Sequence, residues 1–168
     1  MRTRIVIAVA AACAALVLVA GGLASGRARS HGHAQASVKT ENRLLFAVLT
    51  GRKEVSPTGQ RRAGDPDGRG SFTALVKGGQ LCFGITVKNL DQPVAAHIHK
   101  GRRNQAGSIV VPLTQPATGD PGASSGCVPV NPALAHAILK NPHRYYANVH
   151  TMAFPGGAVR GQLFAKSN

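Results

Sequence analysis

The stretch GSFTALVKGGQLCFGITVKN, residues 70–89, decides the fold of this chain. It contains two runs of strand-forming residues joined by Gly78-Gly79, and a glycine pair between such runs is a signal for a β-hairpin. In the second run, apolar side chains occupy alternate positions: Leu81, Phe83, Ile85 and Val87. Alternate residues of a strand share one face. The sequence therefore predicts a hairpin that buries this face in a core.

Short strand-like runs also lie on both sides of the hairpin, at residues 43–50, 94–100, 108–113, 127–130, 145–151 and 157–165. Loops rich in Gly, Pro and Asp separate them, the longest at 51–70 and 114–126. One helix is predicted, with Asn131 as its N-cap, Pro132 as its first residue and Pro142 beyond its end. Many short strands with glycine-rich turns and one short helix predict an all-β fold, an antiparallel β-sandwich of Greek-key type.

The N-terminal segment has the pattern of a secretory signal peptide. Arg2 and Arg4 precede the apolar run 5–20, and the small residues Gly22 and Ala24 follow it. The run is short for a membrane span and no cluster of charges follows it directly, so no stable span is expected after cleavage. The predicted organisation is a signal peptide over 1–24, a flexible linker over 25–42 and a folded domain over 43–168. We expect a secreted protein, either extracellular or associated with the cell envelope.

The chain is strongly basic, with 20 Lys and Arg residues, 6 Asp and Glu residues and a net charge of +14. Loss of the signal peptide would remove Arg2 and Arg4 and leave about +12. Such a charge favours binding to an extracellular protein or an anionic polymer, through pairs such as Arg61-Arg62 and Arg102-Arg103. Export, the absence of Trp and the low aromatic content argue against nucleic acid as a partner.

Two cysteines, Cys82 and Cys127, remain after the predicted signal peptide. In an exported protein an even pair of cysteines is typical of a disulfide. With two candidates only one connectivity is available. A loop of this length is expected to stabilise the fold by roughly 3–4 kcal/mol, mostly by restricting the unfolded chain.

Histidines are concentrated in the stretch AAHIHKG, residues 95–101. In a strand His97 and His99 would share a face, and His150 ends another predicted strand. If the two strands are neighbours, three imidazoles with an open fourth position would suit zinc or copper. The alternative is a buried polar network, in which the histidines share hydrogen bonds with Asn148, Thr151 and Arg160. The residues alone leave both interpretations open.

Motifs for catalysis are not found. There is no serine-nucleophile motif, no pair of carboxylates at hydrolase-like positions and no phosphate-binding glycine loop ahead of a helix. We therefore assign no catalytic residue and expect a protein that is not an enzyme.

Four blocks resemble the CHRD domain family, which is named for its occurrence in chordin. They are LTGRKEVSP (49–57), AAHIHKG (95–101), NQAGSIVVPL (104–113) and YYANVHT (145–151) with the following FPGGAVRGQL (154–163). The resemblance covers about residues 44–165, and the surroundings of Cys82 and Cys127 are similar to those in bacterial members. It implies an immunoglobulin-like or superoxide-dismutase-like β-sandwich, and no established chemistry for stand-alone members. The H-x-H pair is also similar to the copper-binding strand of copper-zinc superoxide dismutases.

The chain departs from the family pattern at Ser56, where proline is frequent, and at Ala158, where an acidic residue is common. If that acid pairs with Arg160 in relatives, Glu54 is its candidate substitute here, in a polar network of Glu54, Asn148 and Arg160. The leading hypothesis is an exported, non-enzymatic binding or scaffolding module of CHRD type whose ligand is unknown. The alternative is a copper- or zinc-binding protein that uses His97, His99 and His150, with redox activity as an option.

Overall fold

The computed structural model describes residues 43–165. The predicted signal peptide (1–24) and linker (25–42) lie outside these residues, as do positions 166–168 of the predicted domain. Across the described part of the chain, no helix has both the length and the apolar character needed to cross a membrane.

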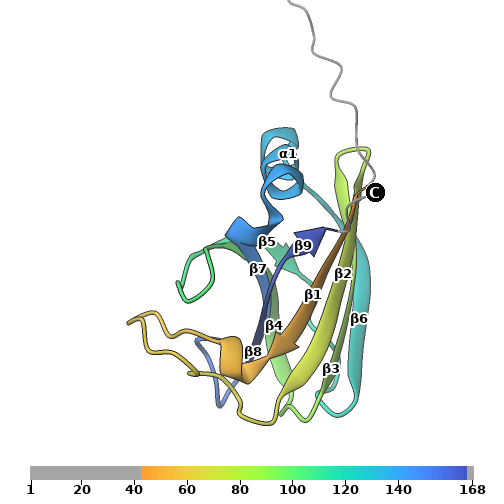
Figure 1. Cartoon of the computed structure of the whole chain (residues 1–168). Coiled ribbons are helices and arrows are strands. Elements are labelled where there is room, and N and C mark those ends of the chain that lie inside the picture. The colour runs from red at the N-terminus through yellow and green to blue at the C-terminus, as the bar shows by residue number, and fades with distance from the viewer. Residues whose placement is uncertain (1–42, 166–168) are drawn as a thin grey trace, which may run out of the picture. The chain divides into compact units, whose positions relative to one another are not determined.

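Short strands make up about half of the described residues (Figure 1). The elements are β1 (Leu44–Thr50), η1 (Gly51–Lys53), β2 (Arg69–Lys77), β3 (Gln80–Lys88), β4 (Pro93–Lys100), β5 (Ser108–Leu113), β6 (Gly122–Pro129), α1 (Pro132–Lys140), η2 (Pro142–Arg144), β7 (Tyr145–Thr151), β8 (Val159–Gln162) and β9 (Phe164–Ala165). Two predictions were wrong in their bounds. Residues 122–126, expected in a loop, belong to β6, because they pair with β3. The run 157–165 is divided between β8 and β9, which pair with different strands.

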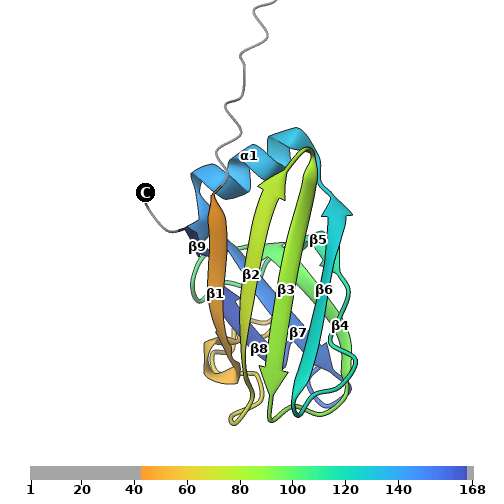
Figure 2. The ribbon, with the colours of Figure 1, turned by 90° about the vertical axis from the view of Figure 1, so that its right-hand side faces the viewer.

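All strands belong to one antiparallel sheet, in the order β5-β4-β7-β8-β1-β2-β3-β6, with β9 also paired to β1. The all-β, antiparallel prediction with one short helix is confirmed. The sheet coils, so that β1, β2, β3 and β6 face β8, β7, β4 and β5 (Figures 1 and 2). It is thus one nearly barrel-shaped sheet rather than two separate ones, and the Greek-key sandwich type stays a prediction.

The link between the two facing halves is β8, which pairs with β7 on one side and with β1 on the other. At this crossing the backbones come close together. A Cβ atom at Gly161 would lie 2.6 Å from the Val48 carbonyl oxygen. Glycine at this position therefore lets β8 approach β1, and the sheet remains continuous between its two halves.

The space between the halves is filled by one apolar core. The alternate residues of the predicted hairpin, Leu81, Phe83, Ile85 and Val87, are buried as expected. They belong to the same core cluster as side chains from the opposite half, namely Ile98, Val149, Val159 and Leu163. Burial of each large apolar side chain contributes roughly 1.5–3 kcal/mol. The helix α1 lies over one end of the sheet (Figure 2), with Ile138 fully buried and the side chain of Asn131 accepting a hydrogen bond from the Ala133 backbone N–H.

The predicted disulfide is present between Cys82 and Cys127. The two residues lie directly opposite each other on β3 and β6. Because β6 is the last strand in the sheet order, the bond fixes a terminal strand to its single neighbour.

Candidate metal centre

The three histidines singled out in the sequence meet in space because β4 and β7 are paired. In the register of these strands His97 is opposite Asn148, and His150 is opposite Ala95, two positions away. His97, His99 and His150 therefore share one face of the sheet. One ring nitrogen from each lies within 4.8 Å of the other two, and His99 and His150 are buried.

His99 presents an unused nitrogen to this cluster. Its Nδ1 donates a hydrogen bond to the Gly107 carbonyl oxygen at 2.8 Å, so Nε2 carries the lone pair. Nε2 is buried and has no hydrogen-bond partner among the residues that the structure describes. The ring stacks on Tyr146, with centroids 4.8 Å apart, and the Tyr146 hydroxyl accepts a hydrogen bond from the Gly107 N–H. A loop carbonyl and a stacked ring thus fix both the tautomer and the orientation of His99.

His150 is held in the same manner. Its Nδ1 donates to the Pro155 carbonyl oxygen at 3.0 Å, which leaves the lone pair on Nε2. That Nε2 lies 3.1 Å from Nδ1 of His97 and also 3.1 Å from Oδ1 of Asn148. Nδ1 of His97 can donate a hydrogen bond to Nε2 of His150, whereas the carboxamide oxygen of Asn148 can only accept one. A nitrogen lone pair and an oxygen lone pair therefore face each other in the centre of the cluster.

The orientation of the Asn148 carboxamide is set by its other neighbours. Its side chain lies beside the Glu54 carboxyl group, whose pKa is raised by burial and lowered in part by Asn148. The N–H groups of an amide are the part that a carboxyl group attracts, and Oδ1 is turned toward the imidazoles. A cation between Oδ1 and the ring nitrogens would relieve the contact between lone pairs.

All three imidazoles are held in the neutral form that binds metals. Burial is the main cause of a lowered pKa at each of them. The pKa of His97 falls to about 4, because the neighbouring His150 and His99 add to the effect of burial. At neutral pH protons therefore do not compete for the nitrogen lone pairs.

These shifts predict acid destabilisation of the metal-free protein. The histidines titrate near pH 6.5 in the unfolded chain, whereas His97 titrates near 4 in the folded one. The unfolded state therefore binds protons first, so stability is complete above pH 6.5 and falls as the pH drops toward 4. We expect a loss of about 1–2 kcal/mol, because His97 is partly exposed and solvent screens its charge. Urea unfolding with a chelator present, from pH 7.5 to 4, measures it. A decrease of the same size in a His97→Gln variant would contradict the assignment to His97.

The structure also brings together the predicted polar group of Glu54, Asn148 and Arg160. Glu54 and Arg160 are buried, with Glu54 Oε1 3.9 Å from Arg160 Nη1. The Arg160 guanidinium lies 3.4 Å from the centre of the Tyr146 ring. It donates to the carbonyl oxygens of Gln105 and Arg102, each at 2.9 Å. Arg160 thus attaches the loop 101–107, which carries Gly107, to the sheet beside the histidines.

The alternative of a self-satisfied polar network fits only part of this geometry. Neither Thr151 nor Arg160 forms a hydrogen bond to a histidine among the described contacts. The Thr151 hydroxyl instead accepts from the backbone N–H of Phe154. The histidine rings use the carbonyls of Gly107 and Pro155 on one side, and Nε2 of His99 stays without a partner.

Several supporting residues were not found from the sequence. Pro155 and Gly107 lie in loops, and their backbone carbonyls carry no signal of a role. Gly157 has a φ of 132°, and a Cβ atom there would collide with the carboxyl group of Glu54. In the sequence the FPGG stretch carries no signal of this role, although its last glycine is what allows Glu54 to approach Asn148. His136 and His143 are exposed and lie outside the cluster.

A family model described as CHRD domain matches residues 45–163. The chain belongs to the CHRD domain family. The CHRD match includes all three clustered histidines and both cysteines of the disulfide. At the level of the family it indicates a non-enzymatic binding module of an extracellular type of domain, with which the disulfide agrees. Neither the curated proteins nor the solved structures include a significant match to the chain.

Proposed function

We propose that this CHRD domain is an exported metal-binding module that holds one copper or zinc ion with His97, His99 and His150. The observation that carries the proposal is the convergence of three imidazoles, one of which, His99, has a buried Nε2 without a hydrogen-bond partner within residues 43–165. An unpartnered buried nitrogen is destabilising by about 1–3 kcal/mol, so its retention needs a reason. Coordination of a metal ion supplies one.

The donor set selects the class of metal. Three neutral imidazoles suit zinc and copper, whereas calcium and magnesium prefer sets of oxygen ligands. The carbonyl oxygens of Gly107 and Pro155 accept hydrogen bonds from Nδ1 of His99 and of His150. A hydrogen bond from the ring nitrogen that does not bind the metal is the usual way in which proteins orient histidine ligands. His97 is only half-buried, so a fourth position next to it is open to solvent or to a small ligand. Copper bound by the three histidines would give the site redox activity, whereas zinc would not.

Export is supported by the signal-peptide pattern over 1–24, by the disulfide and by the type of domain. Outside the cytoplasm the partners expected for a domain of this charge are extracellular proteins and anionic polymers. No reaction is assigned to the module, and its role is to bind and hold the ion.

Calorimetric titration of the full chain, made without a polyhistidine tag and first treated with a chelator, tests the proposal. We expect one equivalent of Zn²⁺ or Cu²⁺ to bind with a submicromolar dissociation constant, on the order of affinities of three-histidine sites. The matched control is His31→Ala with His33→Ala, since this H-G-H pair outside the domain can also capture metal weakly. One-to-one binding that persists in the control supports the proposal. No binding, or binding that the control abolishes, contradicts it.

A further inference from the structure

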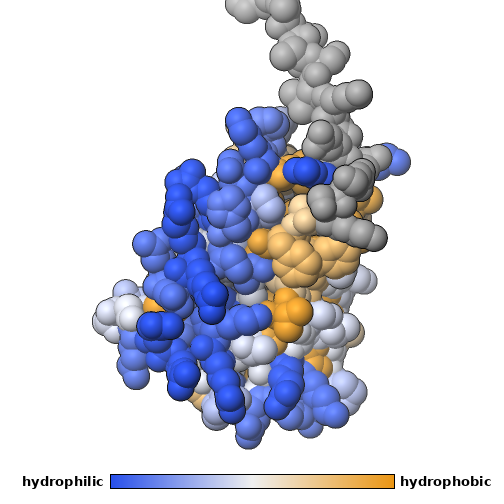
Figure 3. Space-filling model, in the orientation of Figure 1, coloured by the Kyte–Doolittle hydropathy of each residue, from blue (hydrophilic) through white to orange (hydrophobic). Residues whose placement is uncertain are grey.

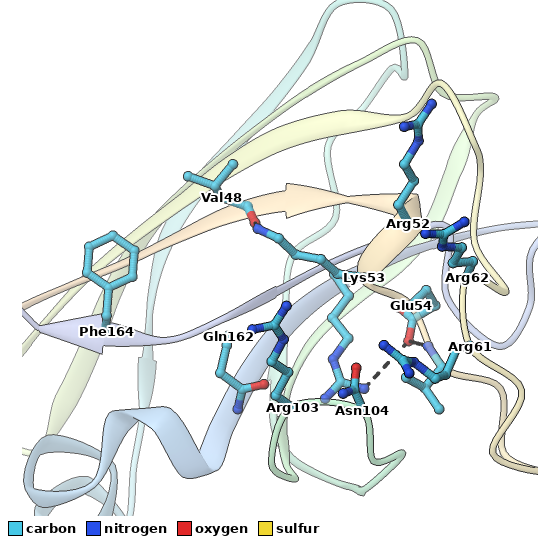
Figure 4. A pocket seen from close by; sticks show the side chains of 12 residues that line it. Val48, Arg52, Lys53, Glu54, Arg61, Arg62, Arg103, Asn104, Gln162 and Phe164 are labelled. Carbon is cyan, nitrogen blue, oxygen red and sulfur yellow. Dashed lines mark hydrogen bonds and ion pairs between the residues drawn. The ribbon is translucent and has the colours of Figure 1, made fainter.

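A cleft of about 470 Å³ lies on the same side of the sheet, next to the polar group of Glu54 and Arg160 (Figure 4). Its walls come from three parts of the chain that are distant in sequence: the segment from β1 through residue 62, the loop 101–107, and strands β8 and β9. The cleft plays no part in the proposed metal centre.

Besides the buried Arg160, five cationic side chains line this cleft: Arg52, Lys53, Arg61, Arg62 and Arg103. All five are exposed. The single acidic residue of the lining, Glu54, is buried and faces Arg160. Within residues 43–165, the ion pairs of the structure leave these five cations without an acidic partner. Arg103, after burial, is the second cause of a lowered pKa at Lys53, which shows how closely the like charges are held.

The loops that carry these charges are attached to the sheet. Arg160 fixes the loop 101–107 through its bonds to two carbonyls of that loop. The segment that carries Arg61 folds back on itself by a bridge between Val55 and Arg61. Lys53 is anchored by a hydrogen bond from Nζ to the Val48 carbonyl oxygen at 2.8 Å. These contacts hold the cationic side chains close together. Repulsion between their like charges therefore does not move them apart into the solvent.

Two residues of the lining have a backbone conformation that favours glycine. Arg62 has a φ of 57° and Asn104 a φ of 63°. For arginine this left-handed conformation is unfavourable by roughly 1–2 kcal/mol, whereas asparagine adopts it more readily. Residues retained under such strain concentrate at sites with a function. An arginine at position 62 in place of glycine is thus consistent with a use for its side chain.

One end of the cleft is apolar and aromatic. Phe164 is 51% exposed and stacks on Phe46 with ring centroids 5.6 Å apart, and Val48 is 57% exposed. Figure 3 shows this hydrophobic patch over β1 and β9, beside a broad hydrophilic surface. A ligand that fills the cleft would meet cations along its length and the Phe164 ring at its end (Figure 4).

We propose that this cleft binds an acidic polysaccharide, a chain whose sugar rings carry carboxylate or sulfate groups. Arginine pairs with such groups through two parallel hydrogen bonds, and a concave surface of one sign of charge concentrates an anionic chain. The exposed Phe164 ring, which is supported by the stacked Phe46, offers an apolar face for C–H contacts with a sugar ring. The charges belong to five side chains spread along the walls, which suits a polymer better than one small anion. A single aromatic pair does not provide the successive stacking platforms that nucleic-acid strands use.

Binding of size-matched oligosaccharides to the full chain tests this proposal. The probes are a sulfated heparin octasaccharide, a carboxylated oligogalacturonate octamer and a neutral dextran oligosaccharide. We expect micromolar binding of at least one acidic probe at 0.1 M salt, weakening steeply with ionic strength, and none of dextran. The acidic probe that binds more tightly shows whether sulfate or carboxylate is the preferred group. Equal binding of dextran would overturn the proposal.

Two triple variants with the same change in charge separate the cleft from general basicity. The cleft variant combines Arg61→Ser, Arg62→Gly and Arg103→Ser. The control combines Lys77→Ser, Lys88→Ser and Lys140→Ser, which are exposed and lie outside the cleft. We expect the cleft variant to lose at least about 10-fold in affinity and the control less than about 3-fold. Equal losses would show diffuse attraction and overturn the proposal.

Two further measurements keep the test decisive. Glycine adopts the left-handed conformation of position 62 without steric strain, so the cleft variant should keep its melting temperature. If it unfolds, phenylglyoxal labelling of the unmodified chain replaces it. The bound octasaccharide should then protect Arg61, Arg62 and Arg103 but not the exposed Arg69 and Arg144.

Vesicles with 30% anionic lipid are the last probe. Tighter, cleft-dependent binding to vesicles than to either acidic probe would contradict a polysaccharide ligand.

Discussion

Replacing His97 with alanine is expected to lower the affinity of the chain for Zn²⁺ or Cu²⁺ by more than about 100-fold. Loss of a supporting group behind a metal ligand typically weakens binding 10- to 100-fold, and loss of a ligand itself should exceed that range. His97 is the most suitable ligand to remove, because it is only half-buried while His99 and His150 are buried. Its replacement should disturb the packing least and leave the fold intact.

The matched control for this variant is His136→Ala. His136 is an exposed histidine of α1, outside the cluster. Titration with each metal, competed with a chelator of known affinity, measures the difference. Unchanged affinity in the control and a large loss in His97→Ala are the expected results. Equal affinities for the two variants would mean that the metal is bound elsewhere.

Replacing Arg160 with methionine is expected to lower the free energy of unfolding by about 3–5 kcal/mol. The substitution leaves the buried Glu54 carboxyl group without its counter-charge. It also removes the two hydrogen bonds to the loop 101–107 and the contact with the Tyr146 ring. Because that loop supplies the carbonyl that orients His99, metal affinity should fall in the same variant.

The double variant Arg160→Met with Glu54→Gln separates the effect of charge from the effect of packing. Removing both charges avoids the unpaired buried carboxylate, so we expect about half of the lost stability to return. Arg144→Met, at an exposed arginine, should change stability by less than about 0.5 kcal/mol. Urea unfolding curves measure all three variants. A double variant no more stable than Arg160→Met alone would show that the ion pair has little energetic role.

The strands themselves could be predicted from the sequence, because alternation of apolar residues is a local signal. The face of β3 that is buried, the positions of β5 and β7, and the start of α1 all follow from alternation or from capping residues. The start of β6 could not be predicted. Its first residues, GASSG, have weak strand propensity, and pairing with β3 determines their conformation.

The candidate site was accessible from sequence only in part. That His97 and His99 share a face follows from their spacing of two. That His150 joins them depends on the pairing of β4 with β7, which no local pattern specifies. The carbonyls of Gly107 and Pro155 and the approach of Glu54 to Asn148 depend on loop conformation. The cationic cleft could not be predicted from the sequence either. Of the two arginine pairs singled out, Arg61, Arg62 and Arg103 line it with Arg52 and Lys53, whereas Arg102 does not.

The most direct test of the central claim is the position of the metal. Crystals of the chain loaded with one equivalent of Zn²⁺ or Cu²⁺, measured at the absorption edge of the metal, give that position by anomalous diffraction. We expect one strong peak at about 2.0–2.1 Å from one ring nitrogen of each of His97, His99 and His150. A metal-loaded crystal whose only peak lies away from these three nitrogens would contradict it.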